Sequence, residues 1–457
     1  MPEQKLKLQP DYGHQGHWEA YEQELAVEYN QCVEEGKDIA QYRALFDAVR
    51  AMPPSEYKAK LAETLFDLQM NAPIRSDYTY NEPDDLQAIR ALRPEWQQTR
   101  TLDLSQEELK DRVRGAWVGR TCGCLLGKPI EGIRTNDLYP LLKESGNWPM
   151  TRYILSTDLS ERCKKETAFL LEKDRQCWAD VIDRAPSDDD TNYTVLYQLL
   201  VEKYGRDFTP ENVAAVWLWY QPKNAYCTAE RVAYCNFVKG YKPPVSAVWH
   251  NPYREWIGAQ IRGDFFGYIN PGNPVEAAKM AYRDACISQV KNGIYGEMFA
   301  AAMIAEAAVT SDRERIIEAG LSVIPVKSRM TRDVRKVLGL WKAGKCADEI
   351  MEVIHTDYNE HTENGWCYTN SNAMVVAMAI LCGEGDYSKS ICLAVQACFD
   401  TDCNGATVGS VIGMMVGESG IDPQWTAPFE RKLMTTIEGY NLVDADELAE
   451  MTAKLVK

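Results

Sequence analysis

Two acidic segments hold the residues of this sequence that are best suited to metal chemistry. Asp188, Asp189 and Asp190 are consecutive, and Asp400 and Asp402, separated by one residue, follow much later in the chain. Hard cations such as Mg²⁺ and Mn²⁺ bind several carboxylate oxygens at once. If the fold brings the two segments together, these five aspartates are predicted to form a metal site.

The alternative is that each segment only begins a helix. Aspartates at a helix N-terminus cap its first turn and interact favourably with its dipole. Asp400 and Asp402 are harder to explain in this way, because they lie between the apolar residues 397–399 and a glycine-rich segment. Burying an unpaired carboxylate is costly. No basic residue lies nearby in the sequence, so a metal is the expected partner, with Thr191 and Thr401 as additional oxygen ligands.

Glu131 is a third acidic candidate, directly after the segment 123–130. A positioned carboxylate can take or deliver a proton during hydrolysis. The alternative for Glu131 is a solvated acid in the loop after a helix.

Two segments with regularly spaced glycines are predicted to position these acids. The glycines recur at every fourth residue: Gly115, Gly119, Gly123 and Gly127 in the first segment, and Gly405, Gly409, Gly413 and Gly417 in the second. This spacing aligns them on one face of a helix, where another backbone can approach. Each glycine costs about 1 kcal/mol relative to alanine within a helix, so close packing is the expected reason for them. We expect the two helices to cross antiparallel, with Glu131 beside Asp400 and Asp402.

Composition limits the classes of function. The chain has 457 residues, a formal net charge of −17 and 14 scattered cysteines. The acidic balance argues against general nucleic-acid binding. There is no apolar stretch suited to a signal peptide or a membrane span, so a cytoplasmic protein with reduced thiols and no membrane contact is predicted. The oligomeric state is not indicated.

Apolar periodicity predicts an all-α protein with an N-terminal helical extension, residues 1–104, and a larger domain, residues 105–457. The larger domain contains all the acidic candidates and is therefore the expected catalytic domain. Helices are expected in the extension at 18–35, 39–52 and 55–70. In the domain they are expected at 107–126, 136–145, 158–171, from 195 and from 210, and then at 274–285, 296–309, 311–323, 331–341, 347–359, 372–381, 387–398, 406–417 and 444–456. Residues 242–274 are expected to form a loop region.

The acidic motifs resemble those of the ADP-ribosylglycohydrolase family in type and order. The segment 114–131 resembles its first motif, 188–191 its second and 400–402 its third. The resemblance implies a compact orthogonal multi-helix domain that holds two divalent cations, Mg²⁺ or Mn²⁺, in a cleft for the ribose of ADP-ribose. It implies that Asp189, Asp190, Asp400 and Asp402 are metal ligands. It also implies that Glu131 gates the cleft or assists catalysis.

The chain departs from the family pattern at several positions. Cys124 replaces the usual aspartate of the first motif, Asp188 replaces a threonine, and Cys403 replaces a hydroxyl residue. Gln289 stands where relatives often have histidine. A thiol is a poor ligand for Mg²⁺.

Other residues are weaker candidates for ligand contact. Asn292, Gly293 and Tyr295 are predicted to form a substrate-binding loop, with an ordinary helix connection as the alternative. The aromatic residues Phe265, Phe266 and Tyr268 could stack on a base, although core packing is the simpler interpretation.

These observations favour a metal-dependent hydrolase that cleaves the glycosidic bond of an ADP-ribosyl or related ribosyl substrate, whether a small molecule or linked to protein. One alternative is a hydrolase of a nucleoside-like or other small glycoside. Another is a non-catalytic protein that binds a ribosyl ligand on the same fold.

Overall fold

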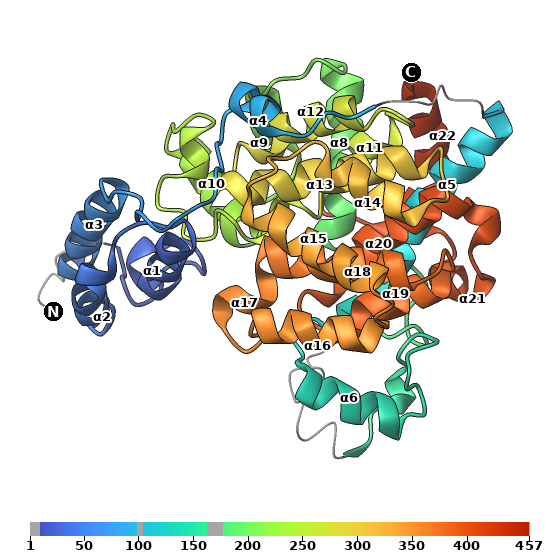
Figure 1. Ribbon diagram of the computed structural model, residues 1–457, viewed down its shortest axis with the longest axis horizontal. Helices are drawn as coiled ribbons and strands as arrows, with labels where there is room; N and C mark the ends of the chain where they lie inside the picture. Colours follow the sequence, from blue (N-terminus) through green and yellow to red (C-terminus); the bar gives the residue numbers. More distant parts are fainter. Residues whose placement is uncertain (1–9, 98–103, 162–176, 457) are drawn as a thin grey trace, which may run out of the picture.

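The computed structural model describes residues 10–97, 104–161 and 177–456, and the protein is all-α with one small hairpin (Figure 1). The N-terminal extension contains α1 (Leu25–Glu34), α2 (Arg43–Arg50), α3 (Glu56–Met70) and α4 (Leu86–Leu92). Its first three helices lie at one end of the molecule and enclose a small core of their own. The expected helices are present, but α1 and α2 are shorter than predicted.

The remaining helices form the main body around one large core. In chain order they are α5 (Gln106–Gly127), α6 (Thr135–Glu144), α8 (Asp189–Tyr204), α9 (Pro210–Tyr220), α10 (Thr228–Val238), α11 (Asp264–Tyr268), α12 (Pro274–Ala285), α13 (Lys291–Ala307), α14 (Arg313–Leu321), α15 (Arg329–Lys342), α16 (Ala347–Asp357), α17 (Glu363–Cys367), α18 (Thr369–Cys382), α19 (Tyr387–Gln396), α20 (Thr401–Val416), α21 (Pro423–Thr426) and α22 (Ala445–Leu455). Most of the helix expected at 158–171 lies outside the described residues.

Local sequence signals account for several helix starts. Ser105 and Glu108 form a capping box before α5: the Glu108 amide donates to the Ser105 hydroxyl, and the Ser105 amide donates to the Glu108 carboxylate. Thr209 caps α9, and Pro210 occupies its first position. Two short strands, β1 (Lys432–Met434) and β2 (Leu442–Asp444), pair antiparallel and were not predicted.

The antiparallel crossing of the two glycine-bearing helices, α5 and α20, is confirmed. A Cβ atom at Gly119 would overlap the carbonyl oxygen of Gly409, and a Cβ at Gly123 would overlap that of Gly405. At the end of the crossing, Gly127 lies against the backbone of Thr401 and Asp402. Gly417 has another role, because it ends α20 with a φ of 75°. The crossing therefore brings the residues after α5 next to the first turn of α20.

Among the described residues, no helix is both long and apolar enough to cross a membrane.

Candidate active site

A cavity of about 570 Å³ lies where α5, α8 and α20 meet. Its lining includes the acidic residues Glu131, Asp188, Asp189, Asp400 and Asp402. Because α5 ends and α8 and α20 begin here, residues far apart in the sequence reach one site. Asp188 is the N-cap of α8, and Asp400 is the N-cap of α20.

Among the described residues, Glu131, Asp400 and Asp402 form a group made only of neighbouring carboxylates. One oxygen from each lies within 4.8 Å of the other two. Glu131 directly follows the short 3-10 helix η3 (Lys128–Ile130), which continues α5. Burial, reinforced by the charges of Glu131 and Asp188, raises the pKa of Asp402 well above its usual value. The group therefore concentrates negative charge in a region that is largely closed to water.

A strained turn aims Asp400 at this group. Cys398 and Phe399, just before it, both have left-handed backbone conformations, with φ of 60° and 59°. Such conformations cost about 1–3 kcal/mol each outside glycine and persist where the surroundings hold them. Phe399 stacks on His355 with ring centroids 4.6 Å apart, and a His355 ring nitrogen lies 3.0 Å from the carbonyl oxygen of Ala397.

Asp190 is fully buried, and the guanidinium group of Arg120 contacts both it and a second acid, Asp264. Arg120, on α5, contacts Oδ1 of Asp190 at 3.0 Å and donates through another nitrogen to Asp264 at 2.5 Å. The other oxygen of Asp190, Oδ2, is buried and has no hydrogen-bond partner. Burial raises the pKa of Asp190 despite Arg120, with Asp188 and Asp189 adding to the rise. An unpartnered buried carboxylate oxygen is a position that a cation would stabilise.

Asp188 is already paired. Its Oδ2 accepts a hydrogen bond from the Lys128 ammonium group, and its Oδ1 accepts one from the Asp190 amide at 2.9 Å. These contacts hold the pKa of Asp188 below its usual value even though burial acts in the opposite direction. The geometry therefore disfavours Asp188 as a metal ligand. Lys128, which is distant from Asp188 in the sequence, is thus its neighbour in space.

Asp189 lines the cavity but belongs to none of the groups whose ligand atoms lie within 4.8 Å of one another. Burial and the neighbouring Asp188 and Glu131 raise its pKa. Among the described residues, no lysine or arginine forms an ion pair with Asp189, Asp400 or Asp402.

The hydroxyl groups expected as extra ligands bind the backbone. Thr401 donates to the carbonyl oxygen of Gly127 at 2.9 Å, which joins α20 to α5. Thr191 donates to the carbonyl oxygen of Asp188 at 3.1 Å.

The predicted loop at Asn292, Gly293 and Tyr295 is wrong, since all three residues lie in the first turns of α13. None of them lines the cavity. The Asn292 side chain donates to Glu82 and Glu255, and Tyr295 donates to the carbonyl oxygen of Pro83 at 2.6 Å. The structure thus gives them structural contacts and does not bring them to the acids.

Aromatic residues of the cavity were not singled out in the sequence. The cavity is lined by Trp18, Tyr253, Trp256 and Trp366. Phe265, Phe266 and Tyr268, by contrast, are fully buried and pack in the core. No periodicity distinguishes the first set from the second, because both come from irregular segments or very short helices.

Comparison with known proteins decides the family. The family model for ADP-ribosylglycohydrolase matches residues 105–456. The chain belongs to the ADP-ribosylglycohydrolase family. A solved structure, an ADP-ribosylglycohydrolase-related protein complex, is similar over 76% of this chain and 98% of its own, with 18% sequence identity and a TM-score of 0.47. That similarity is too weak to extend what the family match shows. The comparison with curated proteins found no match.

Three of the departures from the family pattern, Cys124, Asp188 and Cys403, lie close to the same acids, whereas Gln289 bonds to Glu230 outside these groups. Cys124, Asp188 and Asp190 form one group of neighbouring ligand atoms, and Asp190, Asp402 and Cys403 form another. Burial, with the charges of nearby aspartates, raises the pKa of both thiols, which keeps them protonated. A protonated thiol is no ligand for a hard cation. Glu131, Asp188, Asp189, Asp400 and Asp402 thus line one cavity, with thiols and a lysine beside them.

Proposed function

We propose that this protein is a hydrolase that cleaves the glycosidic bond of an ADP-ribosyl or related ribosyl substrate with the help of divalent cations. The observation that carries this proposal is the convergence of Glu131, Asp400 and Asp402 in a cavity of an ADP-ribosylglycohydrolase family member. Three carboxylates so close together are costly unless positive charge accompanies them.

Two Mg²⁺ or Mn²⁺ ions, the number that the family resemblance implies, are the proposed occupants of this site. Asp400 and Asp402 would hold one ion, with Glu131 beside them, and Asp190 with Asp402 would contribute to the second. Asp189 would complete the set from the cavity wall. When bound, such ions supply positive charge that orients ribose hydroxyl groups and polarises water.

The residues of the chain then have separate tasks. Glu131, half-buried at the cavity wall, accepts the proton of the attacking water as the bond between C1 and the leaving group breaks. The leaving group departs with the bonding electron pair and takes a proton from solvent, to which Glu131 returns the proton it accepted. Lys128 holds Asp188, and Arg120 holds Asp190, so the carboxylates stay oriented while the substrate binds.

A specific observation favours a second candidate, a nucleoside-like or other small glycoside. The described lining of the cavity contains one lysine or arginine, Lys128, and it is paired with Asp188. Cationic side chains commonly bind a diphosphate. A substrate without phosphate would not need them.

The test is a product screen with purified protein in Mn²⁺ or Mg²⁺, and again in EDTA. ADP-ribosylated protein, O-acetyl-ADP-ribose and a panel of nucleosides are the substrates. Metal-dependent release of ADP-ribose supports the first candidate, and release of a base from a nucleoside supports the second. Binding of ADP-ribose without turnover of any substrate would favour a non-catalytic protein.

A further inference from the structure

Part of the cavity wall comes from outside the residues that match the family. His17, Trp18, Glu24 and Val27 line the cavity together with the catalytic-site acids. The family model begins at residue 105. The N-terminal extension therefore contributes to the same cavity as Glu131 and Asp402.

The segment that carries Trp18 is fixed to the main body. Glu19, the next residue, forms ion pairs with Lys223 at 2.6 Å and with Arg231 at 3.3 Å. The Arg231 guanidinium group also lies over the Trp18 ring, 5.5 Å from its centroid, at a distance typical of a cation–π contact. Trp18 itself has a left-handed backbone, with a φ of 62°, which is uncommon for a bulky residue and needs support from its surroundings.

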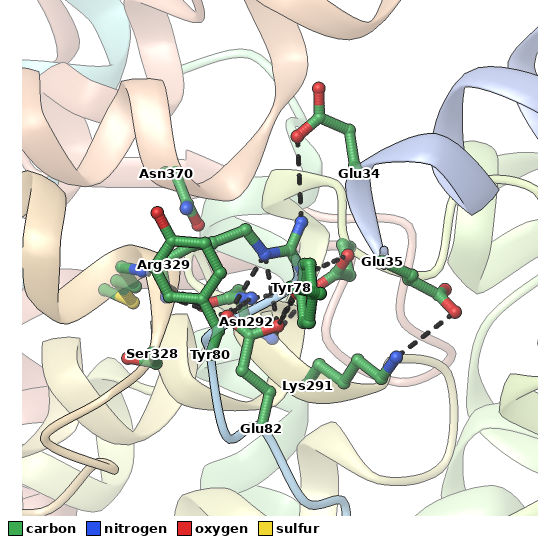
Figure 2. A network of polar contacts seen from close by, with 12 residues as sticks. Glu34, Glu35, Tyr78, Tyr80, Glu82, Lys291, Asn292, Ser328, Arg329 and Asn370 are labelled. Atoms are coloured by element: carbon green, nitrogen blue, oxygen red, sulfur yellow. Dashed lines mark hydrogen bonds and ion pairs between the residues drawn. The ribbon is translucent and has the colours of Figure 1, made fainter. Parts of the chain in front are cut away.

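Buried ion pairs anchor the rest of the extension. Arg254 contacts Glu28 of α1 at 3.0 Å and Glu35 at 2.5 Å, and no side chain among the three is more than 4% exposed. Figure 2 shows the second anchor, where Arg329 meets Glu82 from the extension. Charges buried in this way must keep their partners, so they specify one position for the extension.

The lining has two chemical characters. The acids of the lining suit a ribose and the divalent cations proposed above. The other part of the lining is aromatic and comprises Trp18, Tyr253, Trp256 and Trp366. Aromatic side chains stack on planar groups such as nucleic-acid bases, and such a contact does not depend on hydrogen-bond pattern. Glu24, Asn192 and Asn224 add polar groups to the same wall.

We infer that the extension is a fixed part of the ligand site and that Trp18 is a specificity-determining contact for the planar ring of the substrate. This inference rests on the proposed function, because it assumes that the ribose binds at the acids of the same cavity. It assigns to residues 17–27 a role in ligand recognition that the matched family region does not contain.

The test measures binding to full-length protein by calorimetry with Mn²⁺ present. ADP-ribose and adenosine carry adenine, whereas ribose 5-phosphate lacks it. Trp18→Ala is expected to weaken binding of the adenine-bearing probes about ten-fold, since stacking of one base contributes of that order, and to leave ribose 5-phosphate unchanged. Trp18→Phe keeps a ring and is expected to stay near the wild-type affinity. Trp219→Ala is the matched control, because Trp219 is 76% exposed and lies outside the cavity.

Each outcome decides between the proposals. Equal weakening of all probes by Trp18→Ala would mean a structural role, and no weakening would mean no contact with the ring; either overturns the inference. Thermal melts of each variant show whether it folds, and Trp18→Leu, which keeps an apolar side chain without a ring, replaces Trp18→Ala if that variant does not fold. Wild-type protein that binds no probe overturns the inference, while the product screen alone decides whether the protein is a hydrolase. If Trp18→Ala loses affinity only for the adenine-bearing probes and the wild type turns over no substrate, the inference is supported and the hydrolase is overturned.

Discussion

Glu131 can be tested as a proton carrier because its carboxylate can be changed without altering its size. Glu131→Gln should keep the fold and ligand affinity and lower turnover about 10²–10⁴-fold, the usual contribution of acid–base assistance. Steady-state kinetics on the substrate found by the screen measures the two effects separately. If Glu131 mainly holds a cation with Asp400 and Asp402, metal affinity falls and KM rises as well. Unchanged kcat and KM would remove Glu131 from the mechanism.

Asp402 belongs to two groups of neighbouring ligand atoms, so one substitution affects both. Asp402→Asn should abolish activity and remove the rise in Tm that Mn²⁺ gives the wild type, since bound metal stabilises only the folded state. In EDTA the same variant should be at least as stable as the wild type, because one of several mutually repelling buried carboxylates is gone. Thermal melts in EDTA and in excess Mn²⁺ measure both effects. A wild-type Tm rise retained by Asp402→Asn would contradict the proposed site.

The sequence predicts the acids of this site better than their partners. Asp190, Asp400 and Glu131 stand out by type and local context. Arg120 and Lys128 do not, because each looks like an ordinary helix residue until the fold places it beside an aspartate. Pairing across the fold also decides which acid keeps an unpartnered oxygen, and no local pattern contains that information.

At the scale of elements, the contact of α5 with α20 makes a direct prediction. Gly123→Ala places a methyl group against the carbonyl oxygen of Gly405, so the helices must separate or shift. We expect a loss of about 2–4 kcal/mol in stability, comparable to other severe packing changes. Gly339→Ala in α15 is the control, since no atom lies within 4 Å of the added methyl group. It should be neutral or stabilising by up to about 1 kcal/mol. If Gly123→Ala and Gly339→Ala change the free energy of unfolding in urea equally, the close crossing is not what constrains Gly123.

Helix boundaries show where local sequence is insufficient. The spacing of Gly115–Gly127 and Gly405–Gly417 predicted which helices touch, because glycines aligned on one helix face allow a second backbone to approach closely. The start of α13 was predicted five residues too late, at Gly296 rather than at Lys291. Its first turn is capped by Glu255, which accepts from the Asn292 amide at 3.0 Å. A cap supplied from a distant segment leaves no local signal.

At the scale of the molecule, the extension was recognised as helical, but its connection to the cavity was not predicted. Its links to the main body are single charged residues such as Glu28 and Glu82, which resemble surface residues in the sequence. Only the buried partners Arg254 and Arg329 reveal their role. The domain boundary at residue 104 therefore remains a prediction made from the sequence. Described residues on both sides of this boundary line one cavity.

The anchor at Arg329 gives the last prediction. Its guanidinium group contacts Glu82 at 2.8 Å and Glu255 at 2.6 Å, with all three side chains at most 4% exposed. Arg329→Met leaves both carboxylates buried without their cation and should cost about 3–5 kcal/mol. Adding Glu82→Gln removes one of these charges, so the double variant should be more stable than Arg329→Met alone. Lys336→Met is the control, because the Lys336–Asp357 pair is partly exposed and should contribute less than about 1 kcal/mol. Urea unfolding of the full-length variants measures all three. If Arg329→Met costs no more than Lys336→Met, the extension is not held by this anchor, and its place in the cavity wall would depend on its other contacts, such as those of Arg254 and Glu19.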